Sequence, residues 1–212
     1  MDGKSIEEYI LKHSDSEPEV LQKISRDARV RLIHGDMVSG HLQGRMLKML
    51  AQMINPKQIL ELGTFIGYSA LCFAEALNDD GIIHSVEVDD ELEDIIRKNL
   101  SLSPHGEKVK LYIGDALDII DEFENDSFEL VFIDANKRLY WDYFEKVLPK
   151  IKTGGFILAD NTLWYGKILD QVKSNDWQTK AILEFNDRLS KDQRVEKVIL
   201  PIRDGITLIR KK

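Results

Sequence analysis

Short apolar segments alternate with amphipathic segments from residue 58 almost to the end of the chain, and this alternation constrains the fold more than any other feature. It predicts parallel strands joined by crossover helices that cover both faces of one sheet. Ligands of such sheets bind at the carboxyl ends of the strands. The predicted parallel strands are QILEL (58–62), GIIHSVEV (81–88), KVKLYI (108–113), FELVFIDA (128–135) and GGFILAD (154–160).

The last two apolar segments, 194–202 and 205–212, follow a different pattern. The tight-turn sequence Arg203-Asp204-Gly205 joins them, which predicts an antiparallel hairpin. Together with the parallel strands, this hairpin predicts an α/β fold with a Rossmann-like seven-stranded sheet. The sheet is mostly parallel, ends in the antiparallel pair and has helices on both faces.

The first 54 residues precede the sheet, and helices are predicted at 5–13, 19–33 and 40–54. We interpret 1–212 as a single domain in which 1–54 form an N-terminal helical cap and 55–212 form a cofactor-binding core. The third helix carries a methionine-rich apolar stripe, which we interpret as core packing. The stripe consists of Leu42, Met46, Met49, Leu50 and Met53.

The composition is that of an ordinary globular protein, and no apolar run approaches the ~20 residues that span a bilayer. The N-terminus lacks the features of a signal peptide, and the single cysteine, Cys72, excludes an intramolecular disulfide. We therefore expect a cytoplasmic protein without membrane contacts. The formal net charge of -8 disfavours a broad surface for nucleic acid.

The sequence ILELGTFIGYSA (59–70) places a glycine turn between the first strand and a helix, where nucleotide-like cofactors bind. The dinucleotide fingerprint G-x-G-x-x-G would need glycines at 61, 63 and 66, and only Gly63 matches. Glu61 would repel a pyrophosphate and favour a cationic cofactor. S-adenosylmethionine (SAM) carries a sulfonium and an ammonium group and has no phosphate. The alternative is that Glu61 is a helix-capping acid.

Acidic residues also follow the second and third strands. Glu87 lies about 20 residues past the glycine turn, where an acid can accept hydrogen bonds from both ribose hydroxyls. The acids directly after it could instead serve only the N-terminus of a helix. Asp115 and Ala116 suit an adenine edge and ring, although aspartate is also a favoured helix N-cap.

Three oxygen-bearing side chains, Asp134, Asp160 and Asn161, follow the fourth and fifth strands, which we expect to be neighbours. Two carboxylates and an amide suit a hard divalent cation, above all Mg²⁺, and Mn²⁺ or Ca²⁺ would also fit. Lys137 stands three residues after Asp134. A nearby dication disfavours its ammonium form, which makes it a candidate general base. The alternative is an ordinary surface lysine.

Four segments together resemble the cation-dependent class I O-methyltransferases, the family of caffeoyl-CoA O-methyltransferase, catechol O-methyltransferase and their bacterial relatives. They are ILELGTFIGYSALCFAEAL, GDAL, FIDANK and GGFILADNTLWYG, and the resemblance runs from about Met37 to the C-terminus. It implies SAM as cofactor, with Asp134, Asp160 and Asn161 as metal ligands and with Lys137 and Asp134 as the catalytic pair. The implied cofactor contacts are Met37, Val38 and Ser39 (closing over the cofactor), Glu61, Gly63, Thr64 and Ser69 (methionine moiety), Glu87 (ribose), Asp115 and Ala116 (adenine), and Asp134 and Asn136 (near the ammonium).

Two residues depart from the family pattern. Asn136 replaces the second aspartate of the usual DADK, which removes a negative charge near the cofactor's ammonium group. Tyr165 stands where the plant enzymes have an asparagine, and the lysine that those enzymes use toward their substrate has no clear counterpart here. These departures put a coenzyme A thioester substrate in doubt.

The sequence thus predicts a SAM- and divalent-metal-dependent O-methyltransferase that acts on a vicinal-diol or phenolic hydroxyl of a catechol-like small molecule. Trp141, Trp164 and Tyr165 could stack on an aromatic acceptor, while Tyr140 and Trp141 could equally be core residues. A homodimer is expected because relatives often form dimers. The alternatives are a hydroxyuridine O-methyltransferase of tRNA, a catalytically silent cofactor-binding protein, and a dehydrogenase, which the missing glycines disfavour.

Overall fold

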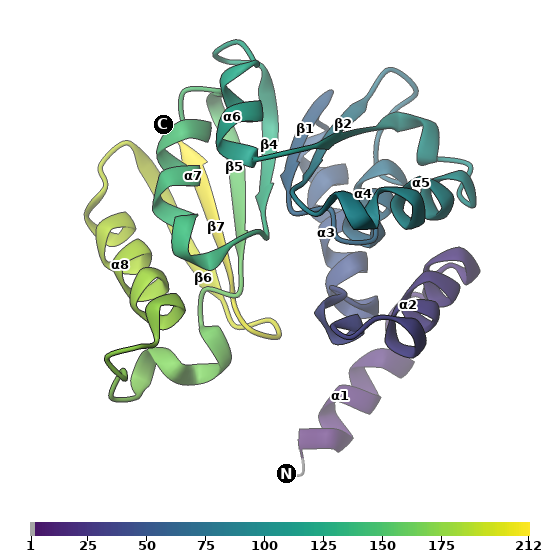
Figure 1. Cartoon of the computed structure of the whole chain (residues 1–212), viewed down its shortest axis with the longest axis horizontal. Coiled ribbons are helices and arrows are strands. Elements are labelled where there is room, and N and C mark those ends of the chain that lie inside the picture. The colour runs from purple at the N-terminus through teal and green to yellow at the C-terminus, as the bar shows by residue number, and fades with distance from the viewer. Residues whose placement is uncertain (1–2) are drawn as a thin grey trace.

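The computed structural model describes residues 3–212 and contains the predicted seven-stranded sheet, with the strand order β3-β2-β1-β4-β5-β7-β6 (Figure 1). β1 to β5 are parallel, whereas β7 runs antiparallel to both β5 and β6. The predicted fold class is therefore confirmed. The strands are β1 (Gln58–Leu62), β2 (Ile82–Glu87), β3 (Val109–Ile113), β4 (Phe128–Ile133), β5 (Ile151–Asp160), β6 (Val195–Leu200) and β7 (Ile206–Lys211).

The strand order reverses at β1, which pairs with β2 on one side and with β4 on the other. At such a switch point the loops that follow the two neighbouring strands diverge and leave room for a ligand. β4 pairs with β5 in turn, so the predicted proximity of the residues after these two strands is confirmed.

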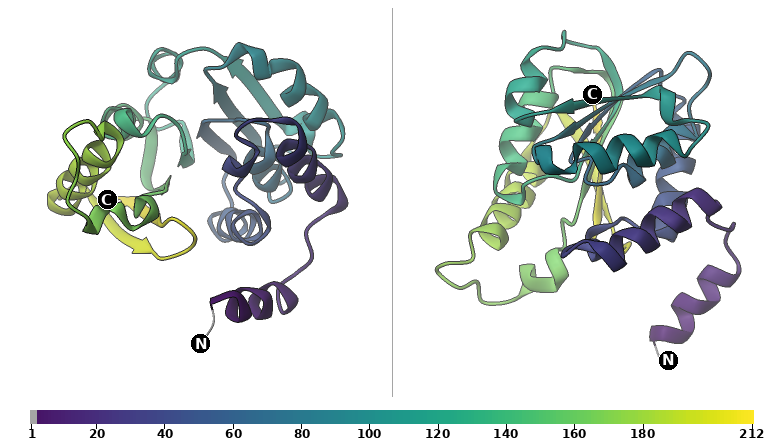
Figure 2. Two further views of the ribbon diagram at one scale, coloured as in Figure 1. Left: turned by 60° about the horizontal axis from the view of Figure 1, so that its bottom comes forward. Right: turned by 45° about the vertical axis from the view of Figure 1, so that its right-hand side comes forward.

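Helices cover both faces of the sheet (Figures 1 and 2). Alternate strand residues point to opposite faces, so Ile59 packs in one core and Leu60 in the other. The first core includes α2 (Glu19–Arg31), α3 (His41–Ile54), α4 (Tyr68–Ala74) and α5 (Glu93–Ser101). The second includes α6 (Ala116–Asp121), α7 (Tyr140–Val147) and α8 (Trp177–Lys191).

The N-terminal helix α1 (Gly3–Lys12) stands off the body in Figures 1 and 2. The described residues also contain short 3-10 helices, which are η1 (Gly35–Met37), η2 (Asp90–Leu92), η3 (Gly106–Lys108), η4 (Lys137–Leu139) and η5 (Trp164–Leu169). No helix within residues 3–212 is both long enough and apolar enough to cross a membrane.

The interpretation of the methionine stripe of α3 as core was wrong for its outer members. Met49 is 60% exposed and Met53 is 80% exposed. α3 instead packs tightly on α4, where a Cβ on Gly44 would approach Cys72 Sγ to 2.8 Å. This close approach turns the small and polar side of α3 inward. The buried side consists of Gln43, Gly44, Arg45, Leu47 and Ala51.

Candidate active site

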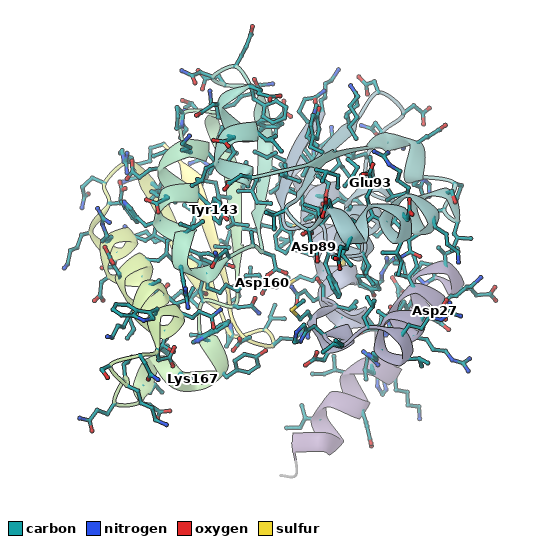
Figure 3. All side chains as sticks on the ribbon, viewed as in Figure 1. Asp27, Asp89, Glu93, Tyr143, Asp160 and Lys167 are labelled. Carbon is teal, nitrogen blue, oxygen red and sulfur yellow. The ribbon has the colours of Figure 1, made fainter. Side chains whose placement is uncertain are left out.

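A cavity of about 790 Å³ opens beside the carboxyl ends of the central strands. The labelled lining residues Asp89 and Asp160 lie near the middle of the view in Figure 3, and the lining residue Tyr143 lies on α7. The lining contains nearly every predicted site residue: Met37, Val38, Ser39, Gly63, Thr64, Ser69, Glu87, Asp115, Ala116, Asp134, Asn136, Lys137, Asp160 and Asn161. Glu61 is the exception and lies behind the lining.

Gly63 occupies a position that only glycine fits. Its φ is +97°, and a Cβ there would lie 2.1 Å from the backbone oxygen of Asp134. The Gly63 N–H donates to Val86 O at 2.9 Å, and the Asp134 N–H donates to Leu62 O at 2.9 Å. The glycine thus lets the loops after β1 and β4 touch, which brings the predicted cofactor turn against the predicted catalytic aspartate.

We expect Gly63→Ala to lower the free energy of unfolding by about 3 kcal/mol or more, because backbone strain adds to a backbone clash. The matched control is Gly166→Ala, where φ is +73° but no atom of the described part of the chain lies within 4 Å of the added Cβ. In this control the alanine adopts the left-handed conformation without a clash, so the free energy of unfolding should fall by only about 1 kcal/mol. Urea unfolding of both variants measures the difference, and equal losses would contradict the close contact.

Glu61 is fully buried, and its carboxylate belongs to a network of hydroxyls. Ser85 Oγ donates to Glu61 Oε2 and shares a second hydrogen bond with Thr64 Oγ1 at 2.6 Å. Ser69, which lines the cavity, lies close to the Glu61 side chain, whereas Glu61 Oε1 has no hydrogen-bond partner among the described residues. Burial raises the pKa of Glu61 from 4.5 to about 7. Ionisation of Glu61 in the folded protein therefore costs free energy, and a cation in the cavity would reduce that cost.

We expect the stability of the cofactor-free protein to depend on the pH through Glu61. A carboxyl whose pKa is raised by folding stabilises the native state at low pH, and this contribution is lost as the pH rises from about 4.5 to about 7. Glu61→Gln cannot titrate. Its stability relative to the original protein should therefore rise by about 3 kcal/mol between pH 4.5 and pH 8. Urea unfolding at several pH values measures this, and a difference independent of pH would contradict it.

Glu87 and Asp115 line the cavity, and their carboxylates accept hydrogen bonds from backbone N–H groups of the surrounding loops. Glu87 Oε2 accepts from the Phe65 N–H at 2.6 Å, and Oε1 accepts from two further backbone N–H groups at 3.0 Å. Asp115 Oδ1 accepts from the Leu117 N–H at 2.8 Å and caps α6. The capping alternative for Asp115 is therefore realised, and the residue still faces the predicted adenine site.

Lys137 joins the two acidic strand ends. Its Nζ donates to Asp134 Oδ1 and to the Tyr140 hydroxyl, both at 2.7 Å. The Tyr140 hydroxyl donates to the backbone oxygen of Asp160 at 2.9 Å, and burial keeps it protonated by raising its pKa well above 10. Lys137 is only 8% exposed, so it is not an ordinary surface lysine.

Asp160 is buried at the end of β5 and is held from two sides. Its Oδ2 accepts from Gln43 Nε2 at 2.6 Å, and its Oδ1 accepts from the Asn161 N–H at 2.8 Å. Burial, and after it the negative charge of Asp134, raises the pKa of Asp160 above its usual 3.8. The negative charges of Asp134 and Asp160 therefore repel each other, and the positive charge of Lys137 partly offsets this repulsion at Asp160.

The loop after β5 supplies aromatic walls to the cavity. Trp164 and Tyr165 line it with the left-handed φ values of +46° and +55°. Tyr140 and Trp141 do not line it. Tyr140 is fully buried, and Trp141 packs on Phe144 and on the Arg188 guanidinium, so the core interpretation holds for both.

Two polar residues of the site escaped the sequence reasoning. Gln43 lay hidden in the helical pattern of 40–54, and Arg203 was interpreted only as part of a turn. His34 also lines the cavity. The positions of Gln43 and Arg203 depend on contacts more than 100 residues apart in the chain, which no local pattern encodes.

Comparison with known proteins agrees with this geometry. The family profile described as O-methyltransferase matches residues 11–212. The chain belongs to the O-methyltransferase family. Caffeoyl-CoA O-methyltransferase of Eucalyptus gunnii is 32% identical over 222 residues, which cover 100% of this chain and 89% of that protein. The predicted family and the predicted enzyme class, an O-methyltransferase, are thereby confirmed.

Solved structures show the same fold. The SAH-bound methyltransferase PaMTH1 of Podospora anserina is 29% identical with a TM-score of 0.90, and the match covers 100% of this chain and 97% of that one. The O-methyltransferase TomG of Streptomyces achromogenes, in complex with SAM, is 26% identical with a TM-score of 0.90. That match covers 100% of this chain and 99% of TomG.

Proposed function

We propose that this O-methyltransferase transfers the methyl group of SAM to a phenolic or vicinal-diol hydroxyl of a small acceptor, with the help of a divalent cation. One observation carries the proposal. Asp134, Lys137 and Asp160 meet at the cavity wall, and the turn at Gly63 touches Asp134. A donor that binds at the glycine turn would therefore lie beside the groups that handle the acceptor hydroxyl.

SAM fits the charge of the cofactor side. Glu61 is a buried carboxylate behind the lining residues Ser69 and Thr64, and one of its oxygens has no hydrogen-bond partner within residues 3–212. Such a charge favours the sulfonium and ammonium groups of SAM and opposes a pyrophosphate. The two solved relatives that hold SAH and SAM in their own structures add support.

The acidic strand ends fit a hard divalent cation. Asp134 and Asp160 repel each other, and a cation between them would relieve this repulsion. Among residues 3–212 no group of three or more histidine, cysteine, aspartate and glutamate side chains could hold a metal ion, so the third protein ligand would be the Asn161 amide. Two carboxylates and an amide are the oxygen ligands that Mg²⁺ accepts. When bound, the cation would lower the pKa of a hydroxyl that it coordinates.

The remaining chemistry belongs to the chain's own residues. Lys137 in its neutral form would take the hydroxyl proton at Nζ, and Asp134 would orient that amine through the hydrogen bond of 2.7 Å. The acceptor oxygen then forms a bond to the methyl carbon while the bond from sulfur to that carbon breaks. The electron pair stays on sulfur and yields S-adenosylhomocysteine. Trp164 and Tyr165 would hold an aromatic acceptor against the site.

A small acceptor suits the charge of the protein better than tRNA does. The formal net charge of -8 gives no general attraction for a phosphate backbone. The aromatic walls and the cavity volume of about 790 Å³ suit a cofactor together with a small ring.

The proposal is tested by titrating SAM into the purified protein in a calorimeter, followed by transfer of the labelled methyl group to catechol or to unmodified and hydroxylated tRNA. We expect one SAM per chain and label on catechol in the presence of Mg²⁺. Absence of SAM binding would contradict the proposal. SAM binding with label only on hydroxylated tRNA would replace the small acceptor by RNA.

A further inference from the structure

The turn between β6 and β7 contacts the segment that lines the cofactor side of the cavity. Arg203 lies in this turn, and its Nη1 donates to the backbone oxygen of Val38 at 3.1 Å. The same nitrogen donates to Gln43 Oε1 at 3.3 Å. Val38 and Arg203 both line the cavity. One guanidinium group therefore ties the last hairpin of the sheet to the residues directly before α3 and in its first turn.

Gln43 continues this connection to the acidic strand end. Its Oε1 accepts from Arg203 and its Nε2 donates to Asp160 Oδ2 at 2.6 Å, so both ends of the amide are used. Only one orientation of the amide satisfies both partners, because the guanidinium offers only donors and an ionised carboxylate only acceptors. Gln43 is 1% exposed. Arg203 thus fixes the orientation of the group that holds Asp160.

The turn itself is anchored on the opposite wall of the cavity. The Leu163 N–H donates to Asp204 O at 2.9 Å, and the Thr162 N–H donates to Gly205 O at 3.0 Å. The Tyr165 N–H donates to the Asp204 carboxylate. The backbone around Arg203 is therefore hydrogen-bonded to the loop after β5, and the guanidinium of Arg203 connects that loop to Val38.

The backbone of Arg203 is strained, which indicates that its side chain matters at this place. Its φ is +49°, in the left-handed region that a non-glycine residue adopts at a cost of roughly 1–2 kcal/mol. Such strain persists where the surrounding structure holds it and clusters at functional sites. The described hydrogen bonds to Val38 and Gln43 are the contacts that this strained residue makes with its guanidinium.

We propose that Arg203 is a positioning residue of the methyl-transfer site. Through Val38 it holds the segment 37–39 over the cofactor, and through Gln43 it fixes the carboxylate of Asp160. The proposal rests on the proposed function for the identity of the cofactor, whereas the contacts of Arg203 can be tested without any ligand.

The test compares Arg203→Gln with the matched control Arg210→Gln. Arg210 is an exposed arginine of the same hairpin, and its guanidinium pairs with Glu196 at 3.4 Å outside the cavity lining. We expect Arg203→Gln to raise the Kd for SAM about five- to tenfold, which is the effect of losing one ordinary hydrogen bond. Amide hydrogen exchange across 37–42 should become faster without ligand. The control should change neither quantity.

The second arm is measured with Mn²⁺ alone. We expect Arg203→Gln to raise the Kd for Mn²⁺ about three- to fivefold, because Gln43 no longer holds Asp160 in one orientation. Arg203→Gly provides a second variant that lacks the guanidinium but relieves the strained backbone, so it should fold as well as the original protein. It should reproduce the effects of Arg203→Gln.

Each outcome decides the proposal. Unchanged exchange across 37–42 in both Arg203 variants would overturn it, and so would a loss of protection spread evenly over the whole chain. Unchanged affinity for Mn²⁺ would overturn the arm that runs through Gln43. If the original protein binds no SAM, the proposed function fails, while the exchange measurement still decides the contact of Arg203 with Val38.

Discussion

Replacing Asp160 by asparagine is expected to lower kcat/KM by about 10³-fold or more while the Kd for SAM changes less than about threefold. A cation at an acceptor oxygen contributes several kcal/mol to the transition state, and each 1.4 kcal/mol is a factor of ten in rate. Asparagine keeps the size of the side chain and one acceptor oxygen for Gln43 Nε2 or the Asn161 N–H. Steady-state kinetics in Mg²⁺ and calorimetry with SAM measure the two quantities.

The control for this variant is Asp118→Asn, an exposed aspartate on α6 outside the cavity lining, which should leave both quantities unchanged. The thermal stability of Asp160→Asn should stay close to that of the original protein, because the change also removes the repulsion from Asp134. An Asp160→Asn enzyme that keeps more than a tenth of the original kcat/KM would rule out Asp160 as a metal ligand.

Replacing Lys137 by methionine is expected to lower kcat by 10²- to 10⁴-fold, the usual contribution of a general base. Methionine fills the space of the buried lysine stem but cannot accept a proton. The loss should fall on kcat, since Lys137 contacts Asp134 and Tyr140 rather than the residues of the predicted adenine and ribose sites. Stopped assays over a range of acceptor concentrations separate kcat from KM.

The neighbouring residue offers a control of the same charge. Arg138 is exposed, and the contact recorded for it is a backbone N–H donated to Asn136 Oδ1, so Arg138→Met should leave kcat unchanged. A Lys137→Met enzyme within threefold of the original kcat would assign Lys137 a structural role only.

The strands and the helices after residue 58 could be predicted because each lies in a short window with its own periodicity. β1 and the turn at Gly63 follow from ILELGTFIGYSA alone, and the acids after β4 and β5 follow from the parallel order of the strands. The carboxyl ends of parallel strands meet at one edge of the sheet. The local pattern was therefore enough to predict that Asp134, Lys137 and Asp160 lie at the same cavity.

The rest depends on packing between distant segments. α3 buries Gln43 and exposes Met53 because Gly44 sits against α4, which hydrophobicity along the helix does not reveal. Glu61 lies behind Ser69 rather than on the cavity wall. The alternation of a strand predicts the face of the sheet to which a side chain points, but not whether other side chains cover it. The contacts of Arg203 are with Val38 and Gln43, which precede it in the chain by 165 and 160 residues.

The central claim is that the two acidic strand ends hold a cation that the methyl transfer needs. The most direct measurement is the rate of methyl transfer from SAM to catechol by metal-stripped enzyme, in EDTA and after addition of Mg²⁺. We predict a rate in EDTA below about a hundredth of that in Mg²⁺, with SAM affinity retained and activity restored when Mg²⁺ is returned. Full turnover in EDTA after verified removal of metal would contradict the claim.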